Sequence, residues 1–181
     1  MKLIFLFLSV SFFSHFSMGQ YRNIELQAAG LTCSLCSNAI QKALKGLPFV
    51  SGVRTELKSN MFMIDLRPGV DVNLDMISLK VEEAGFSVGK LSVEIKFDAV
   101  QIKNDAHVQS AGHIFHFLAV KPQKIEGWQK VKLMDKSFVL SAEAKKNQKL
   151  TTMNCYKTGV TADCCGMGSF PKGKRIFHVT I

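Results

Sequence analysis

The sequence predicts an α+β protein, and the order of two periodicities carries this prediction. Between residues 20 and 97, strand-like runs with every second residue apolar alternate with two helix-like runs whose apolar residues lie three and four apart. The resulting order is strand, helix, strand, strand, helix, strand, which is a split β-α-β (βαββαβ) arrangement. From residue 98 to residue 181 the strand-like runs are short, so we expect a second, small all-β domain, a barrel or a sandwich.

The elements of the first domain follow from this patterning. Strands are predicted at residues 24–28, 50–57, 61–66 and 86–97, a first helix after residue 36 and a second one between residues 73 and 85. Asn73 is a typical N-cap residue, and Gly85 is well placed to end the second helix. Met61 and Met63 alternate along one strand, which favours a role on the sheet face over metal binding.

The second domain offers weaker patterns. Strands are predicted at residues 113–120, 129–133, 138–142 and 175–181, separated by turns that contain proline or glycine. His113 and His116 should face opposite sides of their strand, which makes them poor candidates for sharing one ion. We expect no metal-binding role for these two, for His107 or for His178.

The stretch Gly30-Leu31-Thr32-Cys33-Ser34-Leu35-Cys36 places two thiols three residues apart, where a strand gives way to a helix. Unpaired N–H groups and the helix dipole favour thiolates at a helix N-terminus. Two thiolates at this spacing can converge on one soft ion, and a site with only two thiolates suits Cu(I) better than Zn(II), which prefers four ligands. The spacing alone is also compatible with a zinc knuckle, a redox pair or a disulfide.

This stretch resembles the metal loop of the heavy-metal-associated domain, which occurs in copper chaperones, copper-pumping ATPases and the periplasmic mercury-binding protein. The family pattern is Gly-Met-Thr-Cys-x-x-Cys, and Leu31 stands in place of the methionine, an apolar anchor of similar volume. The resemblance extends from about residue 22 to residue 91. It implies a ferredoxin-like fold for residues 20–97, Cys33 and Cys36 as metal ligands, and Thr32 and Phe86 as the residues around them.

The resemblance implies a binding protein rather than an enzyme. We expect a Cu(I) chaperone or buffer that passes its ion by thiolate exchange to a metal-transporting protein or a metal-acceptor domain. Hg(II), which also takes two thiolates, is an alternative cargo. A thiol-disulfide oxidoreductase using the same pair is a second alternative, although the thioredoxin pattern Trp-Cys-Gly-Pro-Cys is absent.

A second group of sulfur atoms lies near the end of the chain. It contains Met153, Cys155, Cys164, Cys165 and Met167. One interpretation is a second soft-metal site, since thiolates and thioethers both favour Cu(I). The other is a disulfide from Cys155 to Cys164 or Cys165, because a bond between the two adjacent cysteines would strain the peptide between them.

Residues 1–19 have the features of a secretory signal peptide. Lys2 precedes an apolar run, and Ser17-Met18-Gly19 provides small residues for cleavage before Gln20. Serine and histidine interrupt the run, so we expect no membrane span after cleavage and a periplasmic or extracellular protein. The formal net charge is +9, but the lysines are scattered along the chain, which argues against a nucleic-acid partner.

Overall fold

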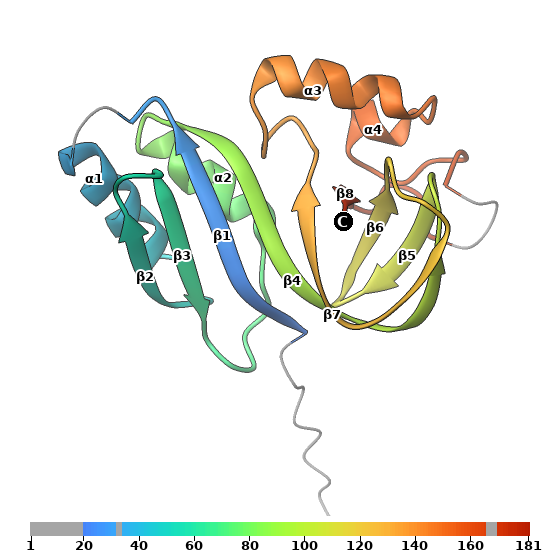
Figure 1. The fold of residues 1–181 in the computed structure, drawn as a ribbon, viewed down its shortest axis with the longest axis horizontal. Helices are drawn as coiled ribbons and strands as arrows, with labels where there is room; N and C mark the ends of the chain where they lie inside the picture. Colours follow the sequence, from blue (N-terminus) through green and yellow to red (C-terminus); the bar gives the residue numbers. More distant parts are fainter. Residues whose placement is uncertain (1–19, 32–33, 166–169) are drawn as a thin grey trace, which may run out of the picture.

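The computed structural model describes residues 20–31, 34–165 and 170–181. Within them, eight strands form a single mixed sheet in the order β2-β3-β1-β4-β7-β8-β6-β5 (Figure 1). The elements are β1 (Tyr21–Ala29), α1 (Ser34–Lys45), β2 (Val50–Glu56), β3 (Met61–Leu66), α2 (Leu74–Glu83), β4 (Ser87–Ile102), β5 (Ala106–Ser110), β6 (His113–Phe117), β7 (Gln123–Leu133), α3 (Ser141–Asn147), a 3-10 turn (Gln148–Leu150), α4 (Cys155–Thr158) and β8 (Ile176–Thr180).

The order of elements predicted for the N-terminal half is confirmed. Strand β1 lies between β3 and β4 and pairs with both in antiparallel register, so its alternate residues Ile24 and Leu26 are completely buried. The Asn73 side chain accepts a hydrogen bond from the backbone N–H of Met76, as expected of an N-cap. Gly85 follows the end of α2 with a φ of +87°, a conformation that glycine adopts without strain.

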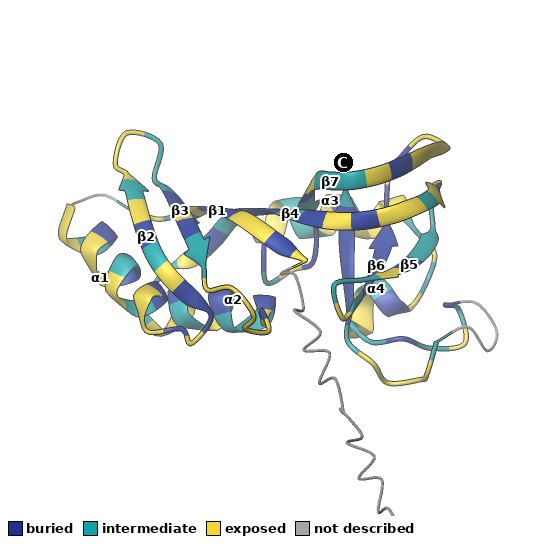
Figure 2. Cartoon of the chain, turned by 90° about the horizontal axis from the view of Figure 1, so that it is seen from below, coloured by how far each residue is buried: buried dark blue, intermediate teal, exposed yellow. Residues whose placement is uncertain are grey.

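Helices α1 and α2 cover one face of the β2-β3-β1-β4 part of the sheet (Figure 2). Each helix buries an apolar stripe against the strands, with Ile40 and Leu44 on α1 and Ile77 and Val81 on α2. The opposite face of these strands carries exposed side chains such as Met63.

The expected small all-β barrel or sandwich is not found, because the sheet does not close. Strand β4 is 16 residues long and continues past residue 97, where we expected the first domain to end. Its free edge pairs with β7 in antiparallel register from Ser92 to Ile102, and β8, β6 and β5 follow in the same sheet. Pairing with the open edge of the long strand β4 extends the existing sheet without creating additional unpaired strand edges. A separate barrel would have to pair its own first and last strands. The division into two domains at this point stays a prediction.

The prediction of a strand at residues 138–142 was wrong. Phe138 and Val139 are buried, but they belong to a turn in which the Phe138 N–H donates a hydrogen bond of 2.9 Å to the Asp135 carbonyl. The helix α3 begins at Ser141. The sequence from Ser141 to Asn147 contains alanine, glutamate and lysine, all good helix formers, and the apolar run before it is too short to extend a strand.

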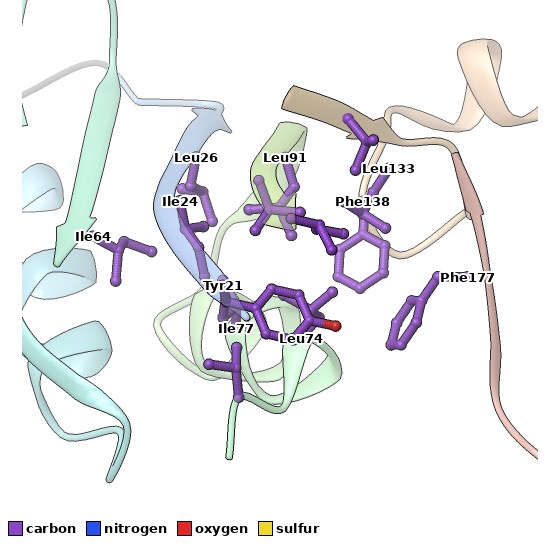
Figure 3. Close-up of a cluster of buried hydrophobic side chains, with 14 of the residues drawn as sticks. Tyr21, Ile24, Leu26, Ile64, Leu74, Ile77, Leu91, Leu133, Phe138 and Phe177 are labelled. Carbon is purple, nitrogen blue, oxygen red and sulfur yellow. The ribbon is translucent and has the colours of Figure 1, made fainter. Parts of the chain in front are cut away.

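The two halves share one hydrophobic core (Figure 3). The cluster of buried side chains around Ile24, Leu26 and Ile77 continues without interruption to Phe138 and Phe177. Phe97 of β4 lies between the halves and contacts the rings of Phe115 and Phe117, with centroid distances of 6.1 and 5.8 Å. Packing of this kind couples the two parts of the sheet.

An ion network also joins the halves. The Arg175 guanidinium donates two hydrogen bonds of 2.8 Å to the Asp75 carboxylate of α2 and lies 3.3 Å from Asp135. The same guanidinium sits over the Phe177 ring at 4.2 Å. A bidentate pair fixes orientation as well as distance, so it holds α2 against the start of β8.

Candidate metal centres

The loop between β1 and α1 carries the first candidate centre. Strand β1 ends at Ala29, and Gly30 follows with a φ of +80°, which turns the chain toward α1 and favours glycine. Leu31 is half-buried and packs against the main core, in the anchoring role expected for the residue at this motif position. Thr32 and Cys33 lie outside the described residues, so their predicted roles stay predictions.

Cys36 lies in the first turn of α1 and is half-buried. The neighbouring Ser37 is buried, whereas Leu35 is 77% exposed, so this turn stands at the molecular surface with one side against the core. A thiol in this position combines access for a partner with the field of the helix N-terminus, which favours the thiolate.

The other residues expected near this loop occupy sheet and core positions. Phe86 is half-buried and packs against the same core as Leu31, and its role beside the metal stays a prediction. Met61 and Met63 flank the buried Phe62 on β3, and Met63 is 37% exposed on the sheet face that the helices do not cover. This placement agrees with the sheet-face role that the sequence indicates.

The structure brings three of the C-terminal sulfur atoms together. The Sγ atoms of Cys155, Cys164 and Cys165 all lie within 4.8 Å of one another, and none of the three residues forms a disulfide. The Sγ atoms of the adjacent Cys164 and Cys165 are 3.8 Å apart. Met153 packs against this group, whereas Met167 lies outside the described residues. The cysteines that the sequence groups therefore lie close together, and their role as metal ligands stays a prediction.

Three histidines that the sequence analysis set aside stand in a row beside these thiols. His107, His116 and His178 occupy directly paired positions on β5, β6 and β8. The rings of His107 and His116 stack with centroids 4.2 Å apart, and that of His178 lies 5.0 Å from His116. His113 points to the opposite face of β6, where it forms a 2.7 Å hydrogen bond with the Tyr21 hydroxyl, as the strand periodicity predicts.

His116 connects the histidine row to the thiols. Its Nδ1 lies 3.5 Å from Cys155 Sγ, and its Nε2 lies 3.0 Å from the Asp105 carboxylate. Ligand atoms of His107, His116 and Cys155 form a group within 4.8 Å. His107 faces His116 across the short antiparallel hairpin of β5 and β6, and the sequence analysis did not predict the strand β5. His178 joins the row through the parallel pairing of β6 with the distant strand β8, for which the sequence carries no local signal.

Burial controls the protonation of this region. It lowers the pKa of His116 to about 4, with the nearby His107 and His178 adding to the effect, so the ring is neutral at neutral pH. Burial also raises the pKa values of the Cys155 and Cys165 thiols. For Cys164 burial acts in the same direction, but hydrogen bonds, the first of them from the Cys155 backbone, outweigh it and lower the pKa.

His178 belongs to a separate buried pair. Its Nδ1 lies 2.8 Å from one Asp135 carboxylate oxygen, and its backbone N–H donates to the other at 2.9 Å. Burial would raise the pKa of Asp135, but the hydrogen bond and charge of His178 and the charge of Arg175 outweigh it, so the pKa lies below its ordinary value. The Nε2 atoms of His178 and His107 are both buried without a hydrogen-bond partner among the described residues.

The described residues also enclose a pocket at the junction between the two halves. It has a volume of about 590 Å³ and is lined by residues of the junction between the halves, among them Tyr21, Asp75, His113 and Arg175. It contains neither a thiol nor the row of His107, His116 and His178.

Neither a protein-family model nor a curated protein matches the chain. None of the helices in the described residues is both long and apolar enough to cross a membrane. Solved structures do match. The yeast copper transporter domain Ccc2a, determined in its apo and Cu(I)-loaded states, is 31% identical, with 36% of this chain and 88% of that domain covered and a TM-score of 0.33.

Two further solved structures match similar fractions of this chain. A copper form of CopA from Bacillus subtilis is 25% identical, with 39% of this chain and 92% of that one covered and a TM-score of 0.34. The N-terminal domain of ZntA in its apo form is 17% identical, with 38% and 89% covered and a TM-score of 0.32. The solved structures similar to the N-terminal part of this chain are thus heavy-metal-associated domains, and they leave the C-terminal part unassigned.

Proposed function

We propose that the protein is an exported carrier of Cu(I), which it holds between the thiolates of Cys33 and Cys36. The observation that carries the proposal is the position of Cys36. It lies in the exposed first turn of α1 and is the last residue of the Gly-x-Thr-Cys-x-x-Cys pattern. Two thiolates with no further ligand favour a two-coordinate soft ion.

The placement of this turn supports transfer by ligand exchange. Leu35, between the two cysteines, is 77% exposed, so a partner can reach the ion without any rearrangement of the core. An incoming thiolate would bind first, giving a three-coordinate ion, and one original thiolate would then leave. The Cu(I)-loaded state of the yeast domain agrees with copper as the cargo. The partner would be a metal-transporting protein or a metal-acceptor domain.

The test is a competition titration of the reduced protein with Cu(I) against a chromophoric chelator. We expect one tightly bound equivalent at this site, lost in Cys36→Ser and in the Cys33→Ser/Cys36→Ser variant. Leu35→Ala is the matched control, since it changes an exposed side chain between the two ligands and should leave the affinity unchanged. Unchanged affinity in the double variant would refute the proposal.

Export is tested separately. If the signal peptide is cleaved before Gln20, N-terminal sequencing of the protein recovered from outside the cytosol should start at that residue or its cyclised form. Recovery of a chain that starts at Met1 in the cytosolic fraction would contradict export and leave the copper titration unaffected.

A further inference from the structure

The second cluster of cysteines has the dimensions of a tetrahedral metal site. A Zn–S bond of about 2.3 Å places two thiolates of a tetrahedron about 3.8 Å apart. The Sγ atoms of Cys164 and Cys165 are separated by 3.8 Å, and Cys155 Sγ lies within 4.8 Å of both. The backbone N–H of Ala162 also points at Cys165 Sγ, at 3.5 Å. Side-chain movements of under an ångström would complete the sulfur face.

His116 offers a nitrogen beside this sulfur group, and its ligand atom lies within 4.8 Å of those of Cys155 and His107. The Asp105 carboxylate accepts a hydrogen bond of 3.0 Å from the Nε2–H of His116, which leaves the lone pair on Nδ1. That Nδ1 faces Cys155 Sγ at 3.5 Å. A carboxylate behind the imidazole is the usual support of a metal-binding histidine, because it fixes both the tautomer and the ring orientation.

Three of these four residues are buried. Cys155 and His116 have no exposed surface, Cys165 is 2% exposed, and Cys164 is half-buried. The hydrophobic cluster around them is small, with only Ile114 and Ile176 as further buried members. The ligands come from β6, α4 and the segment after α4, so a bound ion would join three segments that apolar packing holds only weakly. Four-ligand sites of this type stabilise small folds.

We propose that Cys155, Cys164, Cys165 and the Nδ1 of His116 form a structural site for Zn(II). The number of ligands separates this centre from the loop at Cys33 and Cys36, where two thiolates favour Cu(I). The three thiols lose their protons to solvent when the ion binds. His107 stacks on His116, and its Nε2 has no hydrogen-bond partner among the described residues. Its ligand atom lies within 4.8 Å of those of His116 and Cys155. The proposal is independent of the carrier function.

Cobalt(II) is the probe, because tetrahedral Co(II)-thiolate sites have intense visible ligand-field bands that Zn(II) abolishes on displacement. The reduced, full-length Cys33→Ser/Cys36→Ser protein should bind one equivalent with these bands. Cys165→Ser added to this background should remove them. Absence of the bands in the double variant, or their persistence after Cys165→Ser, would overturn the proposal, as would tight binding of Cu(I) without any binding of Co(II) or Zn(II).

Two further variants keep the test valid if Cys165→Ser fails to fold. Asp105→Asn leaves all four ligands in place and should weaken Co(II) binding about 10- to 100-fold, as is typical of a lost carboxylate support. His116→Ala should weaken it at least as much and change the band positions. His113→Ala, on the opposite face of the same strand, is the control and should change neither. Equal affinities in Asp105→Asn, His116→Ala and the control would exclude His116 as a ligand.

Discussion

Phe97 is the residue at which the coupling of the two halves can be measured. Its ring is 1% exposed and contacts Phe115 and Phe117 of β6, while its backbone belongs to β4, which pairs with β1 of the N-terminal half. Replacing a buried phenylalanine by alanine costs about 3–5 kcal/mol in total, and the two ring contacts, each worth about 0.5–1.5 kcal/mol of that cost, place Phe97 in the upper part of this range. We therefore expect Phe97→Ala to lower the free energy of unfolding by about 4–5 kcal/mol.

For a chain of this size, 1 kcal/mol shifts the melting temperature by about 2–4 °C, so Phe97→Ala should lower it by about 10–15 °C. Two probes should be followed together. Far-UV circular dichroism reports largely on the helices. Fluorescence of Trp128, the only tryptophan, reports on β7 beneath the Arg22 guanidinium, which lies 4.3 Å from its ring centroid. Because one core spans both halves, both transitions should move together.

Two outcomes would contradict this prediction. A loss below about 1 kcal/mol would show that Phe97 is not packed as described. A fluorescence transition that shifts while the circular dichroism transition stays in place would show two independent units, as expected of separate domains. Leu79→Ala on α2 is the control, since this side chain is 49% exposed and its loss should cost under about 0.5 kcal/mol.

Three further predictions concern stability. Asp75→Asn removes the bidentate partner of Arg175, and because the Asp75 side chain is 44% exposed, the urea midpoint should indicate a loss of only about 1 kcal/mol. The pKa of Asp135 is below its ordinary value, so the stability that its carboxylate contributes is present above about pH 4 and is lost as the pH falls through the folded-state pKa. The free energy of unfolding, measured from pH 6 to pH 3, should therefore fall less steeply in Asp135→Asn than in the unchanged protein. Gly30→Ala forces a side chain into a φ of +80° and should lower the melting temperature by an amount equivalent to about 1 kcal/mol; an unchanged value would contradict the turn geometry.

The N-terminal elements could be predicted because their signals are local. Asn73 marks its own helix start, and the alternation around Ile24 and Leu26 is that of a strand buried on one face. The same rules placed Cys36 at the start of a helix. Its partner Cys33 lies outside the described residues, so the geometry of the pair stays a prediction.

The C-terminal arrangement depends on pairing between distant segments. Strand β7 joins the edge of β4, and β8 inserts between β7 and β6, although β8 follows β6 by nearly 60 residues in the chain. The residues of β7 and β8 do not by themselves determine which strands these two pair with, because the strand partner and the register depend on the packing of the whole core. The alignment of His178 with His116 follows from this pairing. His107 faces His116 across the β5–β6 hairpin, whose first strand was not predicted from the sequence.

The long strand β4 constrains the carrier function that we propose. Turning one half of the molecule relative to the other would require breaking the pairing of β4 with β7 and opening the core around Phe97. A partner that approaches the exposed turn of α1 therefore meets a rigid body, with the C-terminal half as a fixed extension on the far side of β1. The shape of the C-terminal half would then restrict which acceptors can bind. Acceptors that clash with it would be excluded even if they make no specific contact at the metal site.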